Sequence, residues 1–393
     1  MLEQKGIPKP LLWTLAVACA LSVANLYYNQ PLLDEIRRTY GASVATIGLV
    51  PTFTQLGYAL GMLFLIPLGD MFERKRLIVG SAILAAGATA LMAIAPTVHL
   101  LIGASLLVGL TTMTPQLIIP FAAHLASDRE RGAVVGTVMS GLLIGILLGR
   151  TVSGIIGAAL GWRAMFWIAS GILLVTAAFL AIILPKNEPT FRGSYAALFR
   201  SLGALIREFR VLRISAVIGA ALFGAFSAFW ATLVFLLQSP WFNHGAGYGA
   251  RVVGFFGLLG AAGALAAPLV GRAADQRGAR FTVGVGLAVT ALSFVILFLS
   301  GHSIPGLILG VLVMDAGVQT GHVSNQSRIF ALSPSARSRV NTVYMFSYFV
   351  GGSLGSSLGS TAWTRAGWTG VCLTALCIVA VGGATFLWER RSA

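Results

Sequence analysis

Long apolar segments recur along almost the whole chain, and they constrain its fold more than any other feature. A helix needs about 20 mostly apolar residues to cross the hydrocarbon core of a bilayer. Because lipid offers the backbone no hydrogen-bond partners, we predict an all-α integral membrane protein with twelve transmembrane helices. The twelve segments are 11–33, 46–68, 77–95, 98–124, 133–160, 163–184, 212–237, 251–270, 281–300, 304–330, 338–363 and 367–388.

The composition agrees with a chain that is surrounded by lipid. Charged residues make up 10% of the sequence, whereas soluble domains carry about 25%. The net charge of +15 does not indicate a nucleic-acid partner, because the basic residues lie in short clusters between the apolar segments. Cys19, Cys372 and Cys377 all fall inside apolar segments, so no disulfide framework is expected. We also expect no cleaved signal peptide.

Lys and Arg are distributed unevenly between the two sides of the predicted membrane. The side of the termini and of the connections after even-numbered segments holds 21 of them, and the opposite side holds 5. Cytoplasmic connections are enriched in basic residues, so both termini are predicted to lie in the cytoplasm and the chain in the inner membrane. The basic, amphipathic stretch 185–211 is predicted to lie along the cytoplasmic membrane surface.

The two halves of the chain resemble each other in sequence. At an offset of 206 residues, for example, Gly149 corresponds to Gly355. We therefore predict two six-helix bundles related by a pseudo-twofold repeat, 1–184 and 212–393, joined by the linker 185–211. Six-span halves in parallel repeat are a known transporter architecture, in which the solute site lies at mid-depth between the halves.

One connection resembles the cytoplasmic signature loop of the major facilitator superfamily. It is Gly271-x-x-x-Asp275-x-x-Gly278-x-Arg280, and a less complete copy follows the second apolar segment. Acidic and basic groups at the ends of spans can form contacts that hold one conformation and break in another, although the basic residues could also act only as positive-inside anchors. The predicted conformational gate consists of Asp70, Arg74, Arg76, Asp275, Gly278 and Arg280.

The fifth apolar segment resembles the antiporter signature of the drug:proton branch of that superfamily. It contains Gly141-x-x-x-Gly145-x-x-x-Gly149 and continues through Gly154, with Arg150 where the signature has proline. The resemblance implies exchange of protons for a solute that leaves the cell. Close packing of helices is the other interpretation of these glycines.

Charged groups at mid-bilayer are expensive and therefore indicate function. Arg150 and Asp315 both lie near the middle of a predicted span. Asp315 begins a polar stripe with Gln319, His322 and Gln326, at spacings that place all four on one helix face. We predict proton coupling through Asp315, Arg150 and His322. A structural Arg150–Asp315 pair and a merely hydrogen-bonded His322 remain as alternatives.

The first, fourth, seventh and tenth spans line the cavity in the family that the chain resembles. Each carries polar or aromatic residues on one face, although bonding between neighbouring helices would also explain Asn25, Gln116 and Gln319, and ordinary packing the phenylalanines. The predicted cavity residues are Asn25, Tyr28, Thr112, Gln116, Phe226, Trp230 and Gln319.

Several functions are excluded by absent motifs. The sequence has no phosphate-binding Gly-x-x-x-x-Gly-Lys-Ser/Thr loop, and its five histidines are too scattered for a zinc site. We expect no cofactor and no enzymatic activity, but a monomeric secondary transporter of a small molecule and protons. Two interpretations remain open: proton-coupled efflux of amphipathic or drug-like compounds, and proton-coupled uptake of a polar metabolite such as a sugar or an organic acid, whose carboxylate Arg150 could bind.

Overall fold

The architecture is helical throughout the part of the chain that the computed structural model describes. That part comprises residues 7–127, 130–187, 195–240, 242, 248–260, 276, 278–333 and 336–391. The predicted all-α class is confirmed. The elements are α1 (Lys9–Ala24), η1 (Gln30–Leu32), α2 (Leu33–Tyr40), α3 (Val44–Ile47), α4 (Leu49–Phe64), α5 (Leu68–Met71), α6 (Arg74–Ile94), α7 (Val98–Thr111), α8 (Thr114–Leu125), α9 (Arg131–Leu160), α10 (Trp162–Ile183), α11 (Tyr195–Glu208), α12 (Arg210–Leu237), α13 (Ala250–Leu259), α15 (Ala279–Ser300), α16 (Ile304–Phe330) and α17 (Arg337–Arg391).

Nine helical segments in the described residues are long and apolar enough to cross a membrane. One of them, α17, has two arms that meet at Ala366 and Gly367, where the backbone is not helical. Gly367 adopts a φ of +56°, a conformation that only glycine adopts without strain. The first predicted span appears as the shorter helix α1, and α13 covers the first part of the eighth, whose residues 261–270 lie outside the described part of the structure. The count of twelve spans stays a prediction.

The first and fourth predicted spans are broken, so the expectation of one continuous helix over each was wrong. After Ala24 the backbone forms turns up to η1, and Thr112 and Met113 separate α7 from α8. Pro31 and Pro115 stand just beyond the two breaks. Proline has no N–H and its ring crowds the preceding turn, which disfavours a regular helix at these points, although α8 itself contains Pro120. Irregular backbone at membrane depth is tolerated only inside protein or beside a cavity.

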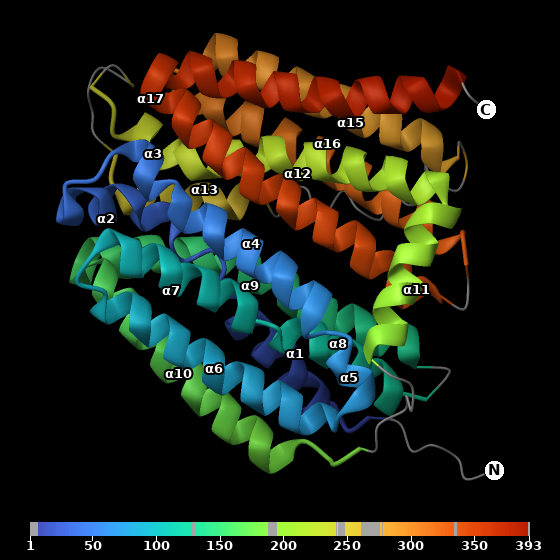
Figure 1. The fold of residues 1–393 in the computed structure, drawn as a ribbon. Helices are drawn as coiled ribbons and strands as arrows, with labels where there is room; N and C mark the ends of the chain where they lie inside the picture. Colours follow the sequence, from blue (N-terminus) through green and yellow to red (C-terminus); the bar gives the residue numbers. More distant parts are fainter. Residues whose placement is uncertain are drawn as a thin grey trace.

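The helices run roughly side by side, and helices far apart in sequence meet. In the first half α1 packs on α9, α4 on α7 and α6 on α10, while in the second half α12 packs along α17 and α15 along α16. The halves touch mainly where α9 meets α13 and α4 meets α17. Figure 1 shows both termini at one end, here called the inner end, and α2 and α3 at the opposite, outer end. The helices of the two halves diverge toward the inner end (Figure 1).

Glycine makes the outer contact between α9 and α13 possible. A Cβ placed on Gly154 would lie 2.4 Å from the carbonyl oxygen of Ala250, and one on Gly254 would lie 2.7 Å from that of Arg150. No side chain fits at these distances, so the two backbones approach only because both positions are glycine. The Thr151 hydroxyl donates a 2.9 Å hydrogen bond to the Gly254 carbonyl oxygen across the same contact.

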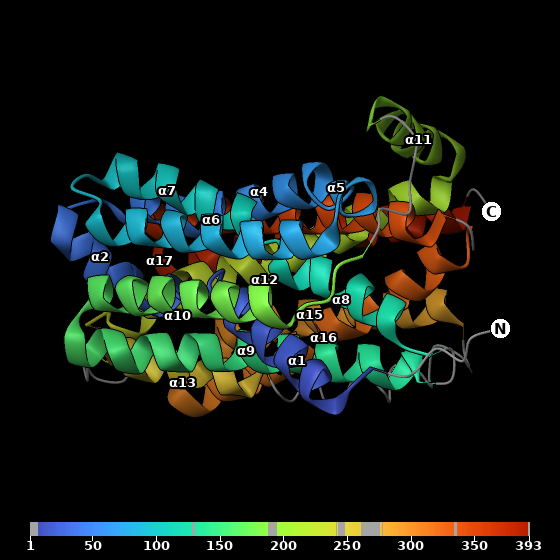
Figure 2. The same cartoon turned by 90° about the horizontal axis from the view of Figure 1, so that it is seen from below.

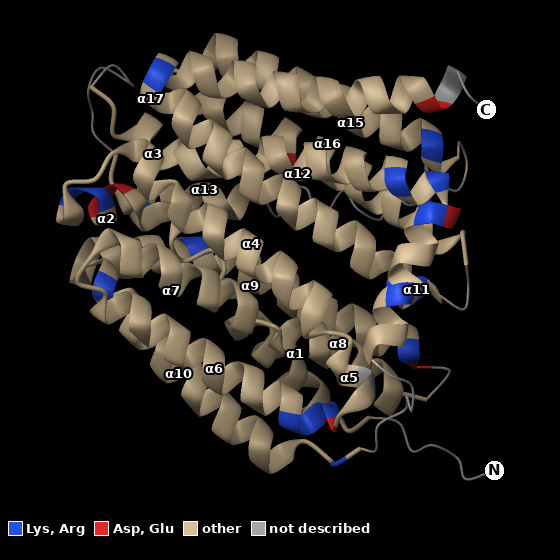
Figure 3. Ribbon diagram, in the orientation of Figure 1, with Lys and Arg blue, Asp and Glu red and all other residues tan. Residues whose placement is uncertain are grey.

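Helix α11 runs across the inner ends of the spans rather than along them (Figures 1 and 2). Its Tyr195 hydroxyl donates a 2.7 Å hydrogen bond to the carbonyl oxygen of Phe64, and Phe199 stacks on the Phe64 ring. The described part of the linker is thus docked onto the end of α4. Figure 3 shows most of the Lys and Arg positions along the ribbon gathered at this inner end.

We expect the inner end, with both termini and the 185–211 linker, to face the cytoplasm, because basic residues favour that side. Short epitope tags at either terminus should be digested by protease in inside-out vesicles and protected in right-side-out vesicles. A tag that is digested from the outside of intact cells would contradict this orientation.

Candidate functional site

Arg150 lies in the middle of α9 and is buried where the two halves of the chain meet. Its Nε donates a 2.6 Å hydrogen bond to Oε1 of Gln30 in η1. Its guanidinium carbon lies 4.1 Å from the ring centre of Trp230 on α12, 4.6 Å from that of Tyr27 and 5.9 Å from that of Phe226. Aromatic faces attract a cation and offset part of the cost of burying it. Arg150 thereby joins helices of both halves.

Asp315 lies near the middle of α16, and only 5% of its surface is exposed. Within the described residues it forms no ion pair at 4.0 Å or less, so a direct Arg150–Asp315 pair is not formed in this conformation. The Arg150 charge nevertheless acts on the Asp315 carboxyl group through space. The two candidate coupling groups are therefore close enough to influence each other but are not bonded.

Two glycines, Gly257 in α13 and Gly260 directly after it, lie close to the two charged side chains. A Cβ on Gly257 would lie 2.9 Å from Cβ of Arg150, and one on Gly260 would lie 3.5 Å from Oδ2 of Asp315. Three residues advance a helix by about 4.5 Å. Arg150 and Asp315 therefore reach neighbouring points on α13, about one turn apart.

Aromatic rings continue from this point toward the inner end. Phe226 lies 6.0 Å from Trp230 and stacks on Phe223 at 5.6 Å, measured between ring centres. Phe223 in turn stacks on Tyr348 of α17 at 4.2 Å. The aromatic face predicted for the seventh span, including Phe226 and Trp230, thus faces the middle of the molecule.

His322 lies on the same stripe of α16 as Asp315 but in a separate cluster. Its Nδ1 is 3.2 Å from the hydroxyl oxygen of Tyr344, and its ring centre is 4.6 Å from that of Tyr348. Seven helical residues span about 10.5 Å, so His322 does not touch Asp315. Gln319 lies between them, partly buried on α16.

Asn25 and Thr112 meet each other at the two helix breaks. The Asn25 Nδ2 donates hydrogen bonds to the hydroxyls of Thr89, at 2.9 Å, and Thr112, at 3.4 Å. All three residues are buried. In this conformation these polar groups are used for bonding between helices, which was the alternative interpretation of Asn25.

Gln116 and Tyr28 lie in different surroundings. The Gln116 Nε2 donates a 3.0 Å hydrogen bond to the hydroxyl of Tyr58, whose ring packs on Phe349 of the other half. Gln116 is thus one residue away from the interface. Tyr28 is buried in the apolar core, and its carbonyl oxygen accepts a hydrogen bond from Ser153. Its neighbour Tyr27, rather than Tyr28, contacts Arg150.

The predicted gate residues near the first signature loop have local partners. Arg74 is buried, and its Nε donates a 3.1 Å hydrogen bond to the carbonyl oxygen of Gly69. Arg76 Nε lies 2.7 Å from Glu73 Oε2, three residues earlier on an exposed turn. Asp70 lies in α5, and its side chain is outside the described part of the structure.

The second signature loop leads into a charged cluster at the inner end. Asp275 lies outside the described residues, and Gly278 adopts a φ of +85° directly before α15. Arg280 Nε lies 3.8 Å from Oε2 of Glu389 at the end of α17, and Glu389 also pairs with Arg328 of α16. This buried carboxylate between two arginines, which sequence reasoning missed, ties three helices of the second half together.

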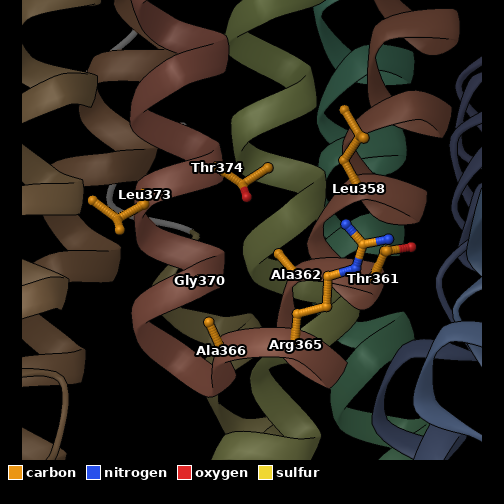
Figure 4. Close-up of a pocket in the computed structure, with 8 residues that line it drawn as sticks. All are labelled: Leu358, Thr361, Ala362, Arg365, Ala366, Gly370, Leu373 and Thr374. Carbon is orange, nitrogen blue, oxygen red and sulfur yellow. The ribbon is translucent and has the colours of Figure 1, made fainter.

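Two cavities lie at different distances from Arg150 and Asp315. One lies between the halves beside Tyr27, Tyr58 and Phe349 and holds about 10 Å³, room for one water molecule. The other is an open groove of about 340 Å³ at the outer kink of α17, lined by residues such as Leu358 and Arg365 (Figure 4). None of its lining residues belongs to the Arg150–Asp315 cluster, so the groove is not part of the candidate site.

Comparison with known proteins decides the family. The model of the Major Facilitator Superfamily matches residues 15–283 and 252–393. This chain is a member of the major facilitator superfamily. Its superfamily relatives include the uncharacterized transporter YgaY of Escherichia coli O157:H7, 43% identical over 380 residues, which are 97% of this chain and 95% of that protein. They also include a Streptomyces coelicolor protein described as "Probable transporter SCO4007", 34% identical over 92% of this chain and 83% of that protein.

The same superfamily fold is found among solved structures. A bacterial homologue of the human lysosomal transporter Spinster, in an inward-facing and unoccupied conformation, superposes with a TM-score of 0.79. The alignment covers 98% of both chains at 14% identity, which supports the fold alone. Membership of this superfamily confirms the resemblance seen in the signature loop and identifies a multi-pass membrane transporter.

Sequence reasoning found the charged members of the cluster and missed most of their partners. Gln30, Tyr27 and Tyr348 all contact it or its aromatic extension. Pro31 is the nearest sequence signal for the first two, because proline disfavours a regular helix through this stretch. No comparable signal marks Tyr348, which lies in a regular helix.

Proposed function

We propose that this superfamily member is a proton-coupled secondary transporter that moves a small amphipathic solute across the inner membrane by alternating access. The observation that carries the proposal is the contact between Arg150 and Trp230, which bridges the two halves beside the buried Asp315. A solute that enters between the halves must separate these groups. A buried carboxyl group whose surroundings change in that step can bind a proton on one side and release it on the other.

In this proposal, 1–184 and 212–393 act as two six-helix bundles that rock about the central site, joined by the linker 185–211. Support comes from the distribution of contacts between them. The contact of α9 with α13 and the 2.8 Å hydrogen bond from Arg38 to Gln238 lie at the outer end, whereas the helices diverge at the inner end (Figure 1). The conformation described here would thus be closed toward the outside.

Two directions of transport have support from different residues. Efflux of amphipathic or drug-like compounds in exchange for protons is favoured by the aromatic side chains of Phe223, Phe226 and Trp230 and by the glycine series of α9. Proton-coupled uptake of a polar metabolite such as an organic acid is favoured by Arg150, a buried cation beside the path.

Transport by purified protein in proteoliposomes tests the proposal. With one proton coupled to each solute, a pH difference of about one unit should produce about tenfold accumulation of solute. The solutes would be 4-phenylbutyrate, 4-phenylbutyramide and 4-phenylbutylamine, which share one apolar body, and a pH-sensitive dye inside the vesicles would report proton movement. The sign of the pH gradient that drives accumulation distinguishes antiport from cotransport. Absence of any gradient-driven flux for all three compounds would refute proton coupling of an amphipathic solute.

A further inference from the structure

Three buried polar atoms in the central cluster have no hydrogen-bond partner among the described residues. They are Nη2 of Arg150, Nε1 of Trp230 and Oδ2 of Asp315. Arg150 and Asp315 are both at least nine-tenths buried, and so is Trp230. Unpaired polar atoms away from water are costly, and folded proteins contain few of them. Three in one place indicate a site that is completed by something other than the chain itself.

The two unpaired donors belong to neighbouring groups. The Arg150 guanidinium lies 4.1 Å above the Trp230 ring, and its Nε is already used by Gln30. The remaining Nη2 and the indole N–H are thus available on adjacent side chains. A carboxylate has two oxygens that accept such charge-assisted and neutral hydrogen bonds, and guanidinium groups bind carboxylates especially well.

The balance of charges in the site indicates whether the solute is a cation or an anion. The site holds one cation, Arg150, and one carboxyl group, Asp315, and net charge is expensive in a buried site. An added organic cation would leave a net positive charge in either protonation state of Asp315. An added carboxylate is balanced if Asp315 takes up one proton at the same time.

We propose that the solute is an amphipathic organic anion whose carboxylate binds Arg150 Nη2 and Trp230 Nε1, while one proton from the adjoining water phase binds to Asp315. This inference rests on the proposed function and selects between its two directions. By linkage, an anion that favours protonation of Asp315 is carried together with the proton. Solute and proton then move in the same direction.

The groups that surround Asp315 agree with this assignment. Among the described residues, one helix contributes a full charge and the others contribute hydroxyl or imidazole groups. Arg150 on α9 and Tyr348 on α17 act on Asp315, whereas Tyr27 after α1 contacts Arg150, and His322 on α16 and Tyr344 on α17 contact each other farther away. Arg150 is thus the cation that a bound anion would neutralise, and Asp315 the carboxyl group that would respond.

The apolar body of the solute would lie on the rings beside the charged groups. Tyr27, in the turn after α1, and Phe226, on α12, come from different halves and both flank Arg150. The cavity beside Tyr27 has room for about one water molecule in this conformation. The solute therefore enters only when the halves separate at this level, which links its binding to the change of conformation.

Calorimetry on the full-length protein in nanodiscs tests the inference with 4-phenylbutyrate, 4-phenylbutyramide and 4-phenylbutylamine. We expect 4-phenylbutyrate to bind at least about tenfold more tightly than the amide or the amine. A tenfold difference in affinity corresponds to a fairly small interaction energy. Its affinity should rise as the pH falls. Titrations in buffers with different ionisation heats should give uptake of about one proton for each anion bound.

Variants at three positions test which side chain binds the carboxylate and which binds the proton. Arg150→Lys keeps the charge and should retain part of the preference for the anion, whereas Arg150→Gln should remove it. Trp230→Phe keeps the ring and removes only the N–H, so it should weaken binding of the anion more than that of the amide. Asp315→Asn should bind the anion with no proton uptake and little dependence on pH. Native size-exclusion profiles and thermal unfolding curves identify any variant that fails to fold.

Preference for the amine or the amide, or binding of the anion without proton uptake by the unmodified protein, would overturn the inference. Failure of all three compounds to bind would overturn it as well. These results are distinct from failure of the proposed function. Gradient-driven transport of the amine with the opposite sign of coupling would leave proton-coupled transport intact and reject only the anionic solute.

Discussion

Replacement of Asp315 by asparagine is expected to abolish accumulation of solute against its gradient, while exchange of solute across the membrane continues. Asparagine has nearly the same shape, but it cannot bind and release a proton. With a pH difference of about one unit, accumulation should fall from about tenfold to none, because the proton gradient no longer contributes to the solute gradient. Counterflow of labelled solute at equal pH should persist, since alternating access itself does not require the proton.

Glu35→Gln is a matched control, because it changes another carboxyl group to an amide outside the central site. Glu35 Oε1 accepts a 3.1 Å hydrogen bond from the backbone N–H of Trp162, and an amide oxygen accepts the same bond. This variant should accumulate solute normally. Asp315→Glu should retain part of the coupling with a shifted pH optimum. Wild-type accumulation by Asp315→Asn would assign the proton to another group, with His322 as the next candidate.

Substitution of Gly154 by alanine is expected to reduce transport by about tenfold or more and to open the outer end. The added Cβ would lie 2.4 Å from the Ala250 carbonyl oxygen, which belongs to the backbone of α13 and is not a flexible group. Overpacking of this kind costs about 1–3 kcal/mol. If that cost falls on the outward-closed conformation alone, the equilibrium between conformations shifts by about 5- to 150-fold.

A cysteine at Ser360 reports the shift. Ser360 is buried against Gly48 across the interface between the halves. In a background without the three natural cysteines, Ser360→Cys should react faster with an impermeant thiol reagent from outside when Gly154→Ala is present. Gly136→Ala is the control on the same helix, because a Cβ there meets nothing within 4 Å. Unchanged transport and reactivity in Gly154→Ala would mean that the α9–α13 contact does not control access.

The charged residues of the candidate site are predictable from the sequence because the spans are surrounded by lipid, in which a charge is costly. Arg150 and Asp315 stand inside long apolar segments, and a buried charge must have a function or a partner in lipid. The same reasoning identified the aromatic face of the seventh span. It named Tyr28 as a cavity residue and did not name Tyr27, which contacts Arg150 from the turn that follows α1. One residue of irregular turn changes which side chain faces Arg150.

The sequence by itself determined the helical class, the lipid environment and the superfamily, since apolar segments of spanning length and short signature loops are local features of the chain. The tertiary structure decided what Arg150 touches. Its hydrogen bond to Gln30 joins residues 120 positions apart, and its ring contact with Trp230 joins the two halves. Such contacts depend on how closely helices approach and at which height they meet. Glycines such as Gly154, Gly254 and Gly257 permit that approach; their spacing indicates close packing, but it does not say which helix is the partner.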